Sequence, residues 1–167
     1  MSTSSHGRLV ALSVVLFTVF GAALTLTGTL LPQLIEHFGL SYGEAGTLQV
    51  SSQVGYLAAI VLSGWLSAKI DGRMMLLAAI VFSLIGYGAF SLAPSFPAAC
   101  ALMIVGGAGG GAIEVIINAV VMKLSETRRS NLLNFIHLFF GVGAFIGPAV
   151  VGKLLALGVT WHWFYFG

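Results

Sequence analysis

The chain has 167 residues, of which 58% are hydrophobic and only 7% are charged, and its mean hydropathy is +1.03. A soluble domain carries about a quarter charged residues, so this composition excludes a water-soluble globular protein and indicates an integral membrane protein. The formal net charge is only +2 and the sequence holds no basic cluster, which argues against nucleic-acid binding. The single cysteine, Cys100, provides neither a disulfide framework nor a metal-ligand set.

Five apolar segments are each long enough to cross the hydrocarbon core of a bilayer, about 30 Å thick, as a helix. They run over about residues 9–31, 46–69, 74–93, 96–123 and 132–157, and a sixth begins at Trp161. Their length and their lack of apolar–polar alternation favour helices over barrel strands. We therefore expect an all-α membrane bundle with short connections, in which the sixth helix is cut short at Gly167.

Lysine and arginine residues are divided unequally between the two sides of these segments. Counting alternate connections, the side of the N-terminus holds Arg8, Lys69, Arg73, Lys123, Arg128 and Arg129. Only Lys153 falls towards the other side. Because positive residues accumulate on the cytoplasmic face, we expect a multi-pass protein of the cell (inner) membrane with a cytoplasmic N-terminus. Glu36 and Glu44 then belong to the first external loop.

The second and fifth segments share a spacing of glycines. Gly64 follows Gly55 by nine residues, and Gly152 follows Gly143 by nine. The same offset aligns Gln49 with His137. Since these two segments cross the membrane in opposite directions, the match fits a three-plus-three inverted repeat.

Polar residues inside the apolar segments fall on helical faces. One polar face is formed by Gln49, Ser52, Gln53 and Tyr56. Milder stripes are formed by Thr18, Gly21, Thr25 and Gly28/Thr29 in the first segment, and by Asn134, His137 and Gly141 in the fifth. Two glutamines are costly against lipid, which favours an aqueous cavity beside the first face. Threonines and glycines are also ordinary helix-packing residues in membranes. His137 has two interpretations, a proton relay or sugar ligand and a hydrogen-bonded packing residue.

The stretch Gly106–Asn118 combines five glycines with Glu114 and Asn118. Glu114 precedes Lys123 by nine residues, or about 13 Å of helix, which puts it near the membrane midplane. Removal from water favours the neutral acid over the carboxylate, so Glu114 is expected to take up and release a proton as the cavity opens to either side. The alternative is a permanently protonated structural glutamate. Asn118, one turn away, is expected to bind a solute hydroxyl or to hold the carboxyl group.

The glycine run has no strand before it and no water interface, so it lacks the setting of a phosphate-binding loop. Close packing against a neighbouring helix is the expected role. The sequence holds no nucleophile–base set and no metal-ligand cluster, so neither an enzyme nor a bound cofactor is expected.

Two motifs carry a family resemblance. The connection Gly64-Trp-Leu-Ser-Ala-Lys69-Ile-Asp71-Gly72-Arg73 and the spacing Gly143…Gly147-Pro148…Gly152 are similar to the 2–3 loop signature and the fifth-span Gly-Pro motif of major facilitator superfamily transporters. The resemblance implies a role in conformational change for Gly64, Lys69, Asp71, Gly72 and Arg73, through a charge contact with the second half of the transporter. Ala68 stands where the loop signature has an aspartate, so this contact is expected to be rearranged. The resemblance implies the N-terminal six-helix bundle of a twelve-helix transporter, with the C-terminal half as its missing partner and a solute bound between the two halves. The chain is then expected to be a fragment.

Three stretches resemble the fucose permease-like sugar:proton symporters, namely Leu30-Leu31-Pro32-Gln33, Glu114-Val-Ile-Ile-Asn118 and Leu133-Asn134-Phe135. In that family the glutamate matching Glu114 acts in sugar binding and transport. The aspartate of that family falls at Gly28, and its fifth-span asparagine falls near Phe140. The resemblance implies proton-coupled uptake of a small polar solute such as a sugar by alternating access. Two alternatives stay open: a proton-driven exporter of drug-like amphipathic compounds, favoured by the Gly-Pro motif, and a non-transporting membrane fragment.

Overall fold

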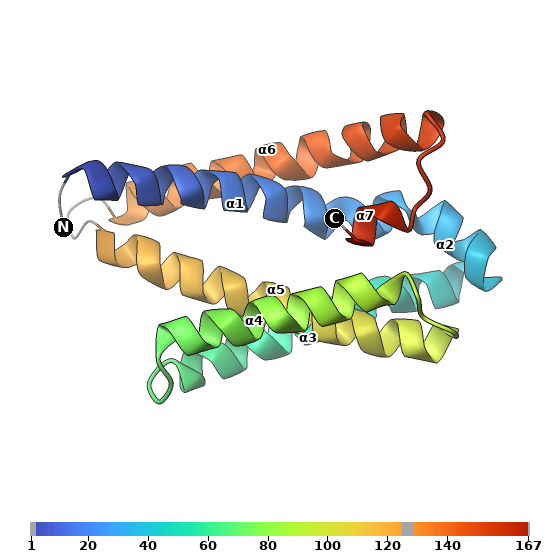
Figure 1. Cartoon of the computed structure of the whole chain (residues 1–167), viewed down its shortest axis with the longest axis horizontal. Coiled ribbons are helices and arrows are strands. Elements are labelled where there is room, and N and C mark those ends of the chain that lie inside the picture. Colours follow the sequence, from blue (N-terminus) through green and yellow to red (C-terminus); the bar gives the residue numbers. More distant parts are fainter. Residues whose placement is uncertain (1–2, 125–128, 167) are drawn as a thin grey trace. The chain divides into compact units, whose positions relative to one another are not determined.

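The computed structural model describes residues 3–124 and 129–166, and Arg128 lies outside them. The described residues form α1 (Thr3–Thr29), α2 (Leu31–Phe38), α3 (Tyr42–Leu66), α4 (Gly72–Phe90), α5 (Phe96–Leu124), α6 (Arg129–Ala156) and α7 (Trp163–Phe166) (Figure 1). They divide into two compact units. The first, which we call the α1–α6 unit, holds α1, α6 and the end of α5 from Ile117 onward. The second, the α3–α5 unit, holds α2, α3, α4, α7 and α5 up to Ile116.

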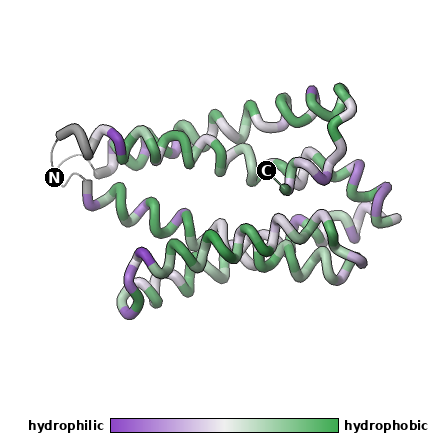
Figure 2. Tube along the Cα trace, viewed as in Figure 1, coloured by the Kyte–Doolittle hydropathy of each residue, from purple (hydrophilic) through white to green (hydrophobic). Residues whose placement is uncertain are grey.

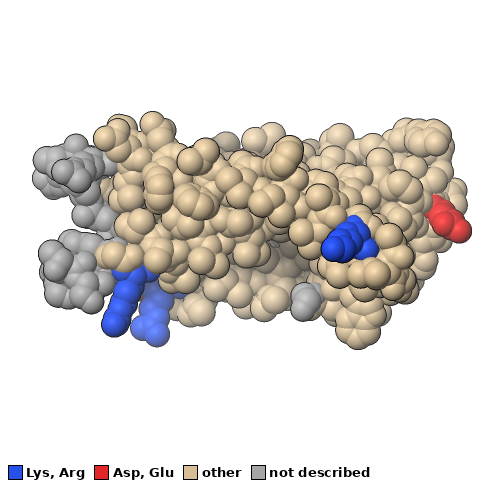
Figure 3. Space-filling view, turned by 90° about the horizontal axis from the view of Figure 1, so that it is seen from above, with Lys and Arg blue, Asp and Glu red and all other residues tan. Residues whose placement is uncertain are grey.

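Five helices of the described chain are long and apolar enough to cross a membrane. They are Gly7–Thr29, Tyr42–Leu66, Gly72–Phe90, Phe96–Lys123 and Ser130–Ala156. Figure 2 shows that apolar residues dominate along these helices, and most of the face seen in Figure 3 is uncharged. The expected all-α membrane fold is confirmed.

The connection between the first two spans differs from the expectation, because it contains a helix. The apolar segment expected over residues 9–31 is interrupted at Leu30, and α2 follows. Pro32 explains the interruption, since proline lacks an N–H group and its ring collides with the preceding helical turn, yet it fits the first turn of a new helix. Gly39, with φ of 63°, ends α2 in the left-handed conformation that glycine adopts without strain.

Capping side chains fix the starts of the next two helices. The Ser41 hydroxyl accepts the Glu44 N–H at 3.3 Å, and the Glu44 carboxylate accepts the Ser41 N–H at 2.8 Å. This capping box starts α3 at Tyr42, four residues earlier than expected, and makes Glu44 a helix cap rather than a free loop residue. At α4, the Asp71 carboxylate accepts the Arg73 N–H at 3.4 Å.

Backbone contact joins α1 to α6 in the first unit, and Figure 1 shows the two helices side by side. A Cβ atom added to Gly21 would overlap the Phe140 carbonyl oxygen, and one added to Gly143 would overlap the Thr18 carbonyl oxygen. Small residues permit this approach, which is the usual basis of helix association in membranes. Phe17, Val121 and Ile136 are buried in the core of this unit.

The glycine run of α5 makes a similar contact with α3 in the second unit. Added Cβ atoms on Gly107 and Gly111 would overlap the carbonyl oxygens of Ser52 and Tyr56, respectively. These two glycines are one turn apart, so they form a flat strip against which the α3 backbone lies.

Two other glycines of the run face α4. A Cβ atom on Gly106 would collide with the Tyr87 ring, and one on Gly109 would collide with the Ser83 side chain and backbone N–H. The run therefore packs against two helices at once, and the expected packing role of the glycines is confirmed.

Aromatic rings pack at the α7 end of the same unit. Trp161 and Tyr165 are buried, and their ring centroids lie 6.0 and 4.6 Å from that of Phe90. Trp163 is 66% exposed. Only part of this aromatic cluster is therefore free to lie at a membrane interface, because the rest holds α7 against α4.

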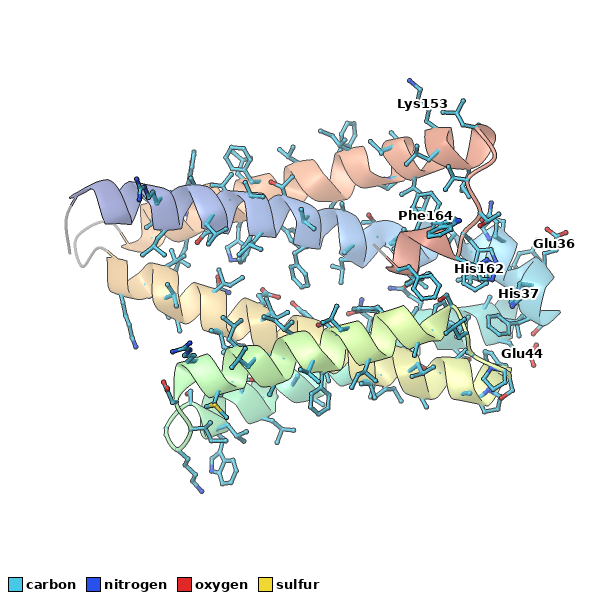
Figure 4. All side chains as sticks on the ribbon, viewed as in Figure 1. Glu36, His37, Glu44, Lys153, His162 and Phe164 are labelled. Carbon is cyan, nitrogen blue, oxygen red and sulfur yellow. The ribbon has the colours of Figure 1, made fainter. Side chains whose placement is uncertain are left out.

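Two histidines meet beside this cluster. His37 of α2 and His162, just before α7, lie 5.5 Å apart between ring centroids (Figure 4). The pKa of His162 is lowered from its ordinary value of 6.5, because partial burial and the neighbouring His37 both disfavour its protonated form.

Substitution of Gly107 by alanine is expected to destabilise the protein by about 1–3 kcal/mol, because the added methyl group must separate α5 from α3. Thermal unfolding in detergent micelles measures the effect. Gly88→Ala is the control, because a Cβ atom at Gly88 meets no atom within 4 Å. Equal unfolding temperatures for the two variants would contradict the packing described for Gly107.

Titration of the His162 ring by NMR is expected to give a pKa below 6.5. In His37→Gln the pKa should rise, because a neighbouring positive charge is removed, yet it should stay below 6.5 because the burial of His162 remains. His137→Gln, in the other unit, is the control and should leave the His162 titration unchanged. A His162 pKa that does not respond to His37→Gln would show that the two rings are not coupled.

Candidate functional site

The central contact of the candidate site joins α3 to α5. The Tyr56 hydroxyl donates a hydrogen bond to the Glu114 carboxyl group. Both residues are half-buried and both belong to membrane-spanning helices. The sequence singled out both residues and did not predict that they are bonded to each other.

The glycine strip explains why these side chains meet. Gly111 lies three residues before Glu114 on α5, and the Tyr56 carbonyl oxygen lies where a Cβ atom of Gly111 would be. Residues three apart share a helical face, so the backbone contact brings Tyr56 beside the turn that carries Glu114. A larger residue at position 111 would hold the helices apart and separate the phenol from the carboxyl group.

A second polar contact lies near the first and involves α4. The oxygens of Ser52 and Tyr87 are 3.3 Å apart, within hydrogen-bonding distance. Ser52 is buried, so this part of the polar face of α3 packs within the unit instead of facing a cavity. Sequence reasoning missed Tyr87. A polar ring between Gly86 and Gly88 in an apolar segment was the available signal.

Gln49 and Gln53 complete the polar face of α3, and both are half-buried. Among the described side chains, no hydrogen bond joins either glutamine to Glu114. The Gln49 side-chain oxygen is buried and has no partner in the described part of the chain. A buried acceptor without a partner is costly, so this amide is available to a solute or to water.

Asn118 and His137 belong to the α1–α6 unit. Asn118 follows Glu114 by one turn of α5, about 6 Å along the axis, and its side-chain oxygen is buried without a partner among the described residues. The exposed His137 has its ring centroid 5.0 Å from that of Phe17 in an edge-on contact. This ring contact agrees with the packing interpretation of His137.

The hydroxyl groups of the threonine stripe of α1 form hydrogen bonds within their own helix. The hydroxyls of Thr18, Thr25 and Thr29 donate to backbone carbonyl groups three or four residues earlier in α1, at 2.8–2.9 Å. Such bonds are common for threonine in apolar helices, and they favour packing over solute binding for this stripe.

The connection between α3 and α4 has a local structure of its own. Asp71 caps α4, and Gly72 is the first residue of that helix. The Lys69 ammonium group lies 3.7 Å from the centroid of the Trp65 ring, a cation–π contact. Gly64 and Gly72 have open space where a Cβ atom would be. The roles implied for these residues and for Arg73 in conformational change stay predictions.

Some glycines of the Gly-Pro motif in α6 pack against α1, and one does not. Gly143 and Gly147 lie against α1, where an added Cβ atom would meet Thr18 and Ala22, respectively. Pro148 lies inside the helix, and Gly152 has nothing within 4 Å of an added Cβ atom.

The Tyr56–Glu114 pair can exchange a proton and form hydrogen bonds with a solute. A carboxyl group can hold or release a proton, and both groups can form hydrogen bonds with hydroxyl groups. Within the described residues, no group of three or more histidine, cysteine, aspartate and glutamate side chains is arranged to hold a metal ion.

These features define a multi-pass helical membrane protein with a carboxyl–phenol pair between two of its spans. The chain belongs to the Major Facilitator Superfamily, whose family model matches residues 13–167. This superfamily consists of membrane transporters and not of enzymes. The predicted superfamily membership is confirmed, whereas the likeness to fucose permeases stays a prediction.

Curated relatives match almost the whole chain. A protein named Protein TsgA homolog from Citrobacter koseri is 26% identical over 166 residues, which are 99% of this chain and 42% of the relative. Protein TsgA from Salmonella arizonae and the TsgA homolog of Yersinia pestis are each 25% identical, with the same coverage. The chain thus spans about half the length of these relatives.

A double-mutant cycle tests whether the Tyr56–Glu114 hydrogen bond contributes to the free energy of unfolding. Tyr56→Phe and Glu114→Ala are expected to show a coupling energy of about 0.6 kcal/mol, and at most about 1.7, the range for hydrogen bonds between membrane helices. Unfolding by a denaturing detergent in mixed micelles supplies the free energies. The control cycle pairs Tyr87→Phe with Glu114→Ala and should show no coupling, because Tyr87 bonds to Ser52.

Proposed function

We propose that this chain is the N-terminal half of a secondary active transporter that couples uptake of a small polar solute, such as a sugar, to proton movement. The observation that carries the proposal is the carboxyl–phenol pair of Glu114 and Tyr56 inside membrane-spanning helices. Ionisable residues in such helices are costly and usually mark an ion or substrate path. Membership of a transporter superfamily supports the same conclusion.

In this proposal Glu114 is the proton-binding residue. When the carboxyl group is ionised, the Tyr56 hydroxyl stabilises it by donation. When it is protonated, it can donate to a solute hydroxyl, and the phenol can accept. Proton uptake and solute binding are then linked because they use the same pair of side chains.

The remaining candidates are polar side chains that we propose as further groups for binding the solute. Gln49 and Asn118 each have a buried side-chain oxygen without a partner in the described chain, which supports a role in binding hydroxyl groups. Gln53 and His137 are weaker candidates, because neither has a buried side-chain polar atom without a partner in the described part of the chain. The sugar class rests on these amides and on the resemblance to sugar symporters.

Alternating access requires a second bundle. We propose that a C-terminal six-helix half completes the solute site and that the two halves rock around it. The lysine and arginine distribution supports a cytoplasmic N-terminus in the cell inner membrane.

Transport assays in proteoliposomes, using the complete two-half protein, test the role of Glu114. Glu114→Gln should abolish proton-driven solute accumulation while exchange of labelled for unlabelled solute across the membrane persists. The amide keeps an acceptor for the Tyr56 hydroxyl but cannot release a proton at physiological pH.

Glu36→Gln is the control, because Glu36 is an exposed residue of α2 outside the site. It should accumulate solute as the unchanged protein does. If Glu114→Gln also accumulates solute normally, Glu114 is not the coupling residue. If sugars fail as substrates and amphipathic cations leave the vesicles on a pH gradient, the exporter alternative replaces the sugar proposal.

A further inference from the structure

An apolar groove lies in the α3–α5 unit, away from the Tyr56–Glu114 pair along α3. Its volume is about 390 Å³, within the range of pockets that hold organic ligands. It is formed by the later turns of α3, the first half of α4 and the middle of α5. None of the residues assigned to the solute site lines it.

Small residues leave the groove open. Its floor is formed by Ala79, Ala108, Gly109 and Ala112. The backbones of α4 and α5 are in contact at Gly109. None of these four residues has a side chain large enough to fill the groove. Ser63 supplies the one polar side chain among the described lining residues.

Exposed apolar side chains line the opening of the groove. Leu62 of α3 is 56% exposed, and Met74 and Phe82 of α4 are 61% and 50% exposed. These residues lie on membrane-spanning helices, where exposed apolar side chains suit contact with lipid hydrocarbon. Buried water needs two to four polar partners, which this lining does not offer. An apolar chain from the bilayer is the occupant that matches the lining.

Two cations lie at one end of the groove. Ile70, in the connection between α3 and α4, lines it, and the exposed Lys69 and Arg73 lie within three residues of Ile70 along the chain. The carboxylate of Asp71, which lies between them, accepts the backbone N–H of Arg73. From Met74 to Phe82 the groove follows α4 inward for eight residues, about 12 Å.

We propose that this groove binds one acyl chain of an anionic phospholipid whose phosphate group interacts with Lys69 and Arg73. The apolar lining selects the chain, and the two cations select the charge of the headgroup. The exposed Trp65 ring beneath the Lys69 ammonium suits the membrane interface, where the headgroup lies. The proposal does not rest on the proposed transport function.

Photocrosslinking tests the proposal directly. The protein is reconstituted in nanodiscs with phosphatidylglycerol carrying a photoreactive group on one acyl chain, or with phosphatidylcholine carrying the same chain. Crosslinked peptides are mapped by mass spectrometry. Labels are expected on the segment Ala78–Phe82 of α4, and more strongly from phosphatidylglycerol.

Ala78→Phe fills the groove and should remove this label. The matched control is Leu77→Phe, because Leu77 is an exposed neighbour on α4 that does not line the groove. Lys69→Gln and Arg73→Gln should each lower the preference for phosphatidylglycerol by about fivefold, and Lys153→Gln should not. These two cations are exposed, so their variants test the proposal even if Ala78→Phe does not fold.

Three results would overturn the proposal. Equal labelling by the two lipids would show that the headgroup charge is not selected. Undiminished labelling of Ala78→Phe would show that the chain lies elsewhere. Labels confined to segments other than Ala78–Phe82 would show that the groove does not hold the acyl chain.

Discussion

Backbone-to-backbone contact along the glycines of α5 is the constraint on which the α3–α5 unit depends. Lipid tails are as apolar as leucine, so helices in a bilayer gain little from hydrophobic burial and must associate through close packing. Gly107 and Gly111 allow the α3 carbonyl groups to lie where a Cβ atom would otherwise be. Gly106 and Gly109 do the same for α4. One short stretch therefore fixes the positions of three spans.

The polar contacts follow from this packing. Tyr56 reaches Glu114, and Ser52 reaches Tyr87, because each pair lies beside a glycine contact. A carboxyl group among apolar spans needs a partner, and the phenol provides one. Small residues of α4 and α5 also leave a groove in this unit, because alanines and Gly109 fill less space than larger residues would. Packing by small residues thus produces both the polar pair and the groove.

Several candidate residues make contacts that are typical of helix packing. The α1 threonines bond to their own helix, His137 packs edge-on against Phe17, and Ser52 is used in packing against α4. The faces were predictable because residues of one helix keep a fixed period. The neighbour that each face packs against was not predictable, because it depends on which helix lies beside it in the folded protein. The spacing of Ser41 and Glu44 fits a capping box that starts α3 at Tyr42. The apolar run of α3 begins later, at about residue 46, which is why hydropathy alone predicted a later start.

By itself the sequence determined the membrane class, the number of long spans and the presence of an acid inside one of them. These are properties of composition and of apolar length, which are local along the chain and follow from the thickness of the bilayer. The tertiary structure decided which side chain meets Glu114, which glycines face which helix and where small residues leave a groove. Such contacts join residues about 60 positions apart in the case of Tyr56 and Glu114. They depend on how closely two helices approach, which no single helical pattern specifies.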